Sequence, residues 1–205
     1  IEIALKIRMA VNRHPLISKY FKIAGADEMI PAEFRQSGFV DYLKPGNTWA
    51  DVVKAIHEDE FYLDPTRMTL ICGTAAMDGT QFKGILASKY NIQVNKTSRN
   101  SVLIQSNINN TRSDIALLVR VLVEICTDIE NRHRTGGDGE KKAFAARVKS
   151  LMEDVPHLPN FSRFHKAFRG DAGDKTPEGD MRTAFFGAYD ETGCEYVPLN
   201  SPDIN

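Results

Sequence analysis

The 205 residues are enough for one domain of ordinary size, or for one domain and part of a second. A hydrophobic fraction of 42% argues against a disordered chain, and a formal net charge of -1 gives no electrostatic reason to expect nucleic acid or an anionic membrane as a partner. No apolar run approaches the roughly 20 residues of a membrane-spanning helix. The 3 cysteines are far apart and form no C-x-x-C pair, which favours reduced thiols in a cytoplasmic protein.

The first predicted element is a helix over residues 1–23, because its apolar residues recur at helical spacing. Pro15 should kink or divide this helix. Ile1 falls inside the amphipathic pattern and no Met precedes it, so we expect the chain to be part of a longer protein. Residues 24–48 are richer in Gly and Pro and predict an ordered connection, with a short helix opened by Pro31.

A second helix is predicted to begin at Trp49, with Thr48 as its capping residue. Its residues expected to face a core are Val52, Val53 and Ile56. The short apolar run over residues 68–72 is rich in β-formers and is followed by Gly73, which predicts a buried strand.

The next elements are a helix over residues 80–90 and two strands over residues 92–96 and 102–105. Only a few residues, among them Thr97 to Asn100, separate the strands, so an antiparallel hairpin is expected. The β-α-β-β-α order of this region predicts an α/β (α+β) fold in which helices cover a sheet.

The strongest helical pattern runs from Arg112 to Arg132, opened by a capping box of Thr111 and Asp114. Its apolar face comprises Ile115, Leu118, Val119, Leu122, Ile125, Cys126 and Ile129. Gly136–Gly139 should end this helix and begin a linker, and a further helix is predicted over residues 140–153.

Several familiar site motifs are incomplete in this chain. His57-Glu58 begins an H-E-x-x-H zinc motif, but Phe61 stands where the second histidine is required. The glycines between residues 73 and 79 have neither dinucleotide nor P-loop spacing. No metal site is therefore expected.

The segment from Asn91 to Asn100 gathers amides, hydroxyls and two cations around the predicted hairpin turn. One interpretation is ordinary turn chemistry, in which these side chains satisfy backbone groups. The other is a binding site for an anionic or polar small molecule. Residue types alone favour the turn.

Four segments together resemble the ornithine/lysine/arginine decarboxylases, which are aminotransferase-fold enzymes that use pyridoxal phosphate. The segments are Leu63–Leu70, Tyr90–Leu103, Asn110–Asp114 and Thr176–Phe186. The similarity covers most of the chain and is best between residues 60 and 125. Any one segment is a weak signal, whereas their order is fairly specific.

The resemblance implies a division of the chain into three parts. Residues 1–58 would be a helical lead-in from the domain that binds the cofactor, 59–135 the aminotransferase-like small domain, and 136–205 a linker with the start of the C-terminal domain. The family's Ser-x-His-Lys motif is absent, and His165-Lys166 does not match it. The resemblance therefore implies no catalytic and no cofactor-binding residue in this chain, and we expect the 205 residues alone to be inactive.

The hairpin departs from the lysine and ornithine enzymes of the family, which carry Glu-Lys-Thr-Gly-Pro-Tyr where this chain has the six residues from Asn95 to Asn100. A carboxylate would neutralise the distal ammonium of lysine or ornithine, and Asn95 lacks that charge. This favours the arginine branch and implies that Asn95, Lys96 and Arg99 bind the substrate.

The family also implies a homo-oligomer, either a dimer or a decamer built from dimers. Three alternatives stay open: lysine or ornithine as substrate, another enzyme of the aminotransferase fold, and a non-catalytic interaction or regulatory domain.

Overall fold

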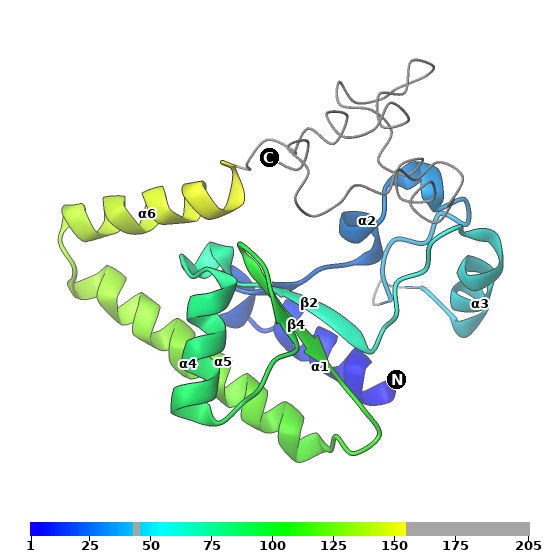
Figure 1. Ribbon diagram of the computed structural model, residues 1–205, viewed down its shortest axis with the longest axis horizontal. Coiled ribbons are helices and arrows are strands. Elements are labelled where there is room, and N and C mark those ends of the chain that lie inside the picture. Colours follow the sequence, from blue (N-terminus) through cyan, green and yellow to red (C-terminus); the bar gives the residue numbers. More distant parts are fainter. Residues whose placement is uncertain (43–45, 155–205) are drawn as a thin grey trace, which may run out of the picture. The chain divides into compact units, whose positions relative to one another are not determined.

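The computed structural model describes residues 1–42 and 46–154 (Figure 1). These residues combine helices with one antiparallel sheet, so the predicted mixed α/β (α+β) class is confirmed. The α-helices are α1 (Glu2–Asn12), α2 (Ala26–Met29), α3 (Trp49–Glu58), α4 (Gly79–Tyr90), α5 (Arg112–Thr135) and α6 (Asp138–Met152). Short 3-10 helices are η1 (Ile17–Lys19), η2 (Ala32–Phe34) and η3 (Gly73–Ala75), and the strands are β1 (Lys22–Ile23), β2 (Arg67–Ile71), β3 (Lys96–Thr97) and β4 (Ser101–Gln105).

The sheet has the strand order β1-β2-β4-β3, and all of its pairs are antiparallel. In the central pair, Leu70 lies opposite Val102 and Met68 lies opposite Ile104. Met68, Leu70 and Val102 are buried in the same core as the apolar residues of α1, α4 and α5. These helices therefore cover one face of the sheet, as expected for an α+β arrangement.

The predicted hairpin is confirmed, although its first strand is shorter than expected. Strand β3 covers residues 96–97, whereas the prediction began it at Ile92. Helix α4 continues to Tyr90 and ends at Asn91 in the left-handed conformation, so the chain needs the next residues to turn back toward the sheet.

The long helix α5 follows its predicted pattern closely. Asp114 accepts hydrogen bonds from the backbone N–H of Thr111 at 2.7 Å and from its hydroxyl at 3.2 Å, which completes the start of the helix. Leu118, Leu122 and Cys126 are buried on its inner face. Packing of an amphipathic face is what stabilises a helix of this length.

The beginning of the chain is only partly helical, which corrects the prediction of one helix to residue 23. Pro15 follows α1, and residues 22–23 form edge strand β1. Asn12 explains the change of direction, because its side chain donates to the carbonyl oxygen of Ile23 at 2.9 Å and accepts from the N–H of Ile23 at 2.8 Å. These bonds draw the chain onto the sheet.

Helix α3 faces its core through different residues than predicted. Val52 is buried, as expected, and Ala55 is buried with it. Val53 and Ile56 are each 51% exposed, so their predicted inward orientation is wrong. The helix packs through a narrow stripe against a small second cluster, which includes Ala26 and Phe39.

Arg8 is buried between the main core and this second cluster. Only 1% of the residue is exposed, and burial lowers the pKa of its guanidinium from the ordinary value. Its nitrogens donate to the carbonyl oxygens of Ala24 at 3.0 Å and Arg67 at 3.3 Å. The guanidinium also lies 5.3 Å from the centre of the Tyr42 ring. One side chain thus links α1, β2 and the segment before α3.

Near the end of the described region, α6 begins at Asp138, two residues earlier than predicted, so only Gly136 and Gly137 separate it from α5. It packs against η3 and buries Leu151. The division of the chain at residues 58 and 135 stays a prediction, and the resembling segment Thr176–Phe186 lies outside the described residues.

We expect Arg8→Met to lower the free energy of unfolding by at least about 2 kcal/mol, because buried carbonyl oxygens lose their donors while the side-chain volume is kept. Arg120→Met, on the exposed side of α5, is the control and should change stability by no more than about 0.5 kcal/mol. Urea unfolding of the two variants measures the difference. Equal stabilities would show that the Arg8 bonds contribute nothing.

Candidate functional site

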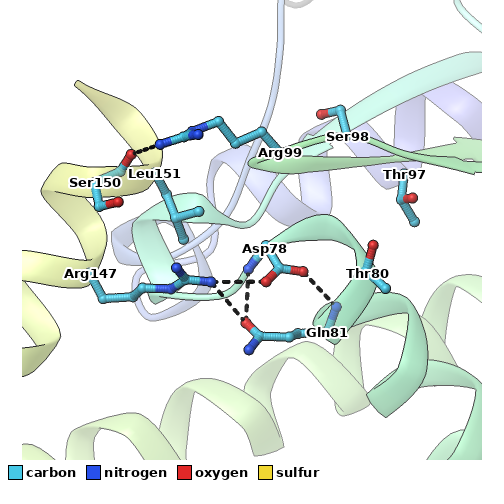
Figure 2. Close-up of a pocket in the computed structure, with 9 residues that line it drawn as sticks. All are labelled: Asp78, Thr80, Gln81, Thr97, Ser98, Arg99, Arg147, Ser150 and Leu151. Atoms are coloured by element: carbon cyan, nitrogen blue, oxygen red, sulfur yellow. Dashed lines mark hydrogen bonds and ion pairs between the residues drawn. The ribbon is translucent and has the colours of Figure 1, made fainter. Parts of the chain in front are cut away.

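A polar cleft of about 700 Å³ opens where the hairpin tip, the start of α4 and the end of α6 meet (Figure 2). Its lining residues are Asp78, Thr80, Gln81, Thr97, Ser98, Arg99, Arg147, Ser150 and Leu151.

Backbone hydrogen bonds fix the hairpin tip against α4. The N–H of Gly79 donates to the carbonyl oxygen of Ser98 at 3.1 Å. The N–H groups of residues 72 and 73 both donate to the carbonyl oxygen of Asn100, at 2.8 and 3.0 Å. A Cβ atom at Gly79 would lie 2.3 Å from the carbonyl oxygens of Ser98 and Ser101. Only glycine allows α4 to start this close to the turn.

Asp78 organises the α4 side of the cleft. Its carboxylate accepts from the backbone N–H of Gln81 at 2.8 Å, which caps the helix. The same carboxylate accepts from Arg147 Nη2 at 2.9 Å, so it joins α4 to α6. Figure 2 shows Arg147 pointing from α6 toward Asp78 and Gln81. Both partners of this ion pair are partly exposed, which limits its contribution to stability.

Arg99 forms the opposite side of the cleft and points toward α6 (Figure 2). Its Nη2 donates to the carbonyl oxygen of Ser150 and, at 3.0 Å, to that of Asp154. Carbonyl groups at the end of a helix have no partner within the helix and carry partial negative charge. Arg99 therefore acts as a cap for the end of α6.

The other two residues predicted to bind the substrate lie outside the cleft. The Asn95 side chain donates to Gln105 Oε1 at 3.0 Å, across the sheet edge. Lys96 is exposed and lies opposite Leu103 in the strand pairing. The structure thus brings Arg99 to the cleft, while Asn95 and Lys96 lie on the neighbouring strand and its approach.

The side chains that complete the cleft were not predicted from the sequence. Asp78 and Gln81 have the spacing of a capping box, and this pattern could have located the start of α4. Arg147 and Ser150 carry no comparable signal, because they reach the hairpin only through the packing of α6 on η3.

The residues described do not fit the cofactor that the resemblance implies. Pyridoxal phosphate is bound through a lysine amine, which must lose its proton to react. None of the described lysines is buried, and the hydrogen bond that Lys89 donates to the Glu124 carboxylate raises the pKa of Lys89 above its ordinary value. The described residues also contain no group of three or more His, Cys, Asp or Glu side chains that could hold a metal ion.

The described helices include none that combines the length and apolarity needed to cross a membrane. Comparison of the chain with protein-family models, curated proteins and solved structures found no match.

We expect Arg99→Ala to release the end of α6, because the carbonyl oxygens of Ser150 and Asp154 lose their donor. Hydrogen exchange should become faster at the last-turn amides of α6 and remain unchanged in α5. Lys96→Ala removes a neighbouring cation that lies outside the cleft and serves as the control. Similar exchange rates in both variants would contradict the capping role of Arg99.

Proposed function

We propose that this chain belongs to a pyridoxal-phosphate-dependent decarboxylase of basic amino acids, acting on arginine to give agmatine and carbon dioxide in the cytoplasm. The chain would supply the small domain and the beginning of the C-terminal domain. The lysine that binds the cofactor would come from a part of the protein outside these residues.

The observation that carries the proposal is the position of the resembling segments. Residues 63–70 lead into β2, residues 90–103 form the hairpin, and residues 110–114 cap α5. The segment that departs from the lysine and ornithine enzymes is therefore the exposed edge of the sheet, next to the cleft. An exposed polar edge of this kind is suited to complete the wall of a substrate channel formed with another domain.

The uncharged side chain at position 95 supports arginine over lysine or ornithine as the substrate in this proposal. With Nδ2 of Asn95 donating to Gln105, its Oδ1 is the atom available to a substrate guanidinium. An amide oxygen can accept from a planar guanidinium without a full ion pair, whereas a compact ammonium favours a carboxylate. Lys96 and Arg99 would repel the cationic group at the distal end of the substrate, so they would lie closer to the substrate carboxylate.

Homo-oligomerisation is the second part of the proposal. Helix α3 exposes Trp49, Val53 and Ile56 at i, i+4 and i+7, which form an apolar stripe on one side of the helix. Exposed apolar stripes are characteristic of surfaces that meet another subunit or domain. The same stripe would also serve a non-catalytic interaction domain, which is the competing proposal.

Asn95→Glu in the full-length protein should shift specificity toward lysine and ornithine. A new carboxylate gains a charge-assisted hydrogen bond to an ammonium, and each 1.4 kcal/mol gained corresponds to about tenfold in kcat/KM. Measurement of kcat/KM for arginine, lysine and ornithine should therefore show a change of about tenfold in the ratios.

Asn109→Glu is the matched control, since it makes the same change at an exposed turn after β4. Its ratios should equal those of the unmodified enzyme. Unchanged ratios in Asn95→Glu would contradict contact between residue 95 and the substrate. Absence of decarboxylation in the unmodified full-length protein would contradict the proposed function and favour an interaction domain.

A further inference from the structure

The lining of the polar cleft between the hairpin, α4 and α6 suits a ligand that carries hydroxyl groups. Its volume of about 700 Å³ lies within the range of about 300–1,000 Å³ that is common for small-molecule sites. In the described part of the chain, Leu151 is the one apolar residue that lines it. The hydroxyls of Thr80, Thr97 and Ser150 make no hydrogen bond within the described residues. A hydroxyl both donates and accepts, so these groups can pair with the hydroxyls of a ligand.

Two guanidinium groups lie on the α6 side of the cleft, whereas Thr80 and Thr97 lie on the opposite side (Figure 2). Arg99 uses Nη2 for the carbonyl oxygens at and after the end of α6, and Arg147 uses Nη2 for Asp78 and Gln81. Within the described residues, Nε and Nη1 of both arginines have no hydrogen-bond partner. Each guanidinium therefore keeps N–H donors for a ligand, and hydrogen bonds from a guanidinium to a carboxylate are among the strong ones.

The residues that line the cleft leave it with one excess positive charge. Asp78 pairs with Arg147 and offsets one of the two arginines. The start of α4 and the end of α6 both meet at the cleft, and their partial charges are opposite in sign and offset each other. One excess positive charge favours a monoanion over a cation, and over a phosphate group, whose second negative charge would have no partner.

We propose that this cleft binds a small polyhydroxylated carboxylate, of the chemical class of the sugar acids. The carboxylate accepts hydrogen bonds from Arg99 and Arg147, and the hydroxyl groups of the carbon chain bond to Thr80 and Thr97. The proposal goes beyond the decarboxylase activity, because neither Asn95 nor pyridoxal phosphate takes part. Arg99 belongs to both proposals and caps α6, so the variants used to test this site leave it unchanged.

Three probes with six carbon atoms separate the contributions of charge and hydroxyl groups. Gluconate has a carboxylate and a hydroxylated chain, sorbitol lacks the charge, and hexanoate lacks the hydroxyls. In equilibrium dialysis of the full-length protein at neutral pH and low ionic strength, gluconate should bind saturably and about tenfold or more tightly than either other probe. Absence of saturable gluconate binding would overturn the proposal, as would equal affinity for gluconate and either of the other probes.

Two substitutions that change the charge of the cleft should move the affinity for gluconate in opposite directions. Arg147→Gln removes a cation and should weaken gluconate binding about tenfold or more. Asp78→Asn removes the competing anion and should tighten it about threefold or more. Asparagine keeps the cap of α4, because its side-chain oxygen can still accept from the N–H of Gln81. The affinity for sorbitol should stay within about twofold in both variants.

Arg120→Gln is the matched control, since it makes the same change at an exposed position of α5 that does not line the cleft. Its affinity for gluconate should equal that of the unmodified protein. If circular dichroism shows that Arg147→Gln does not fold, Asp78→Asn decides the outcome. Equal affinities in Arg147→Gln and Arg120→Gln, or weaker binding in Asp78→Asn, would contradict the site. Because binding is measured without turnover, absence of decarboxylation leaves this result unaffected, and loss of gluconate binding leaves the decarboxylase proposal unaffected.

Discussion

The close contact between the first residue of α4 and the hairpin turn determines where the polar groups of the candidate site lie. The N–H of Gly79 donates to the carbonyl oxygen of Ser98 at 3.1 Å. A Cβ atom added to Gly79 would lie only 2.3 Å from the carbonyl oxygens of Ser98 and Ser101, so there is no room for a side chain. The helix and the turn therefore have one relative position. Asp78 then faces α6 from one side of the cleft, and Arg99 faces it from the other.

Helix α4 connects this cleft to a second, mainly apolar cavity of about 400 Å³ among α4, α5 and α6. Its first turn supplies Asp78 and Gln81 to the cleft, and its last turns supply Ile85 and Tyr90 to the cavity. Phe82 and Leu86 lie on another side of the same helix, are fully buried and anchor the helix in the core. A displacement of α4 would therefore alter both the cleft and the cavity, which makes its contact with the hairpin the constraint on which both depend.

Local patterns predicted the elements that depend on local chemistry. The α5 helix followed from its apolar spacing and the Thr111–Asp114 capping box, and the hairpin followed from two β-rich runs with a short turn. Strand β1 was missed because its two residues pair with β2, which is distant in the sequence, and are held there by the bonds between Asn12 and Ile23. Likewise, Arg147 could not be assigned to the cleft, since its distance from Asp78 depends on how α6 packs. Long-range packing, which has no periodic signature, accounts for both omissions.

A comparison of Gly79→Ala with Gly84→Ala tests this constraint most directly, because both changes add one methyl group to the same helix. A Cβ atom at Gly84 would have no neighbour within 4 Å, so alanine there should raise the free energy of unfolding by up to about 1 kcal/mol. Alanine at position 79 should lower it by about 2 kcal/mol or more and speed amide exchange at residues 98–101. If both variants are equally stable and exchange in the hairpin is unchanged, the position of α4 is not fixed by its contact with the hairpin.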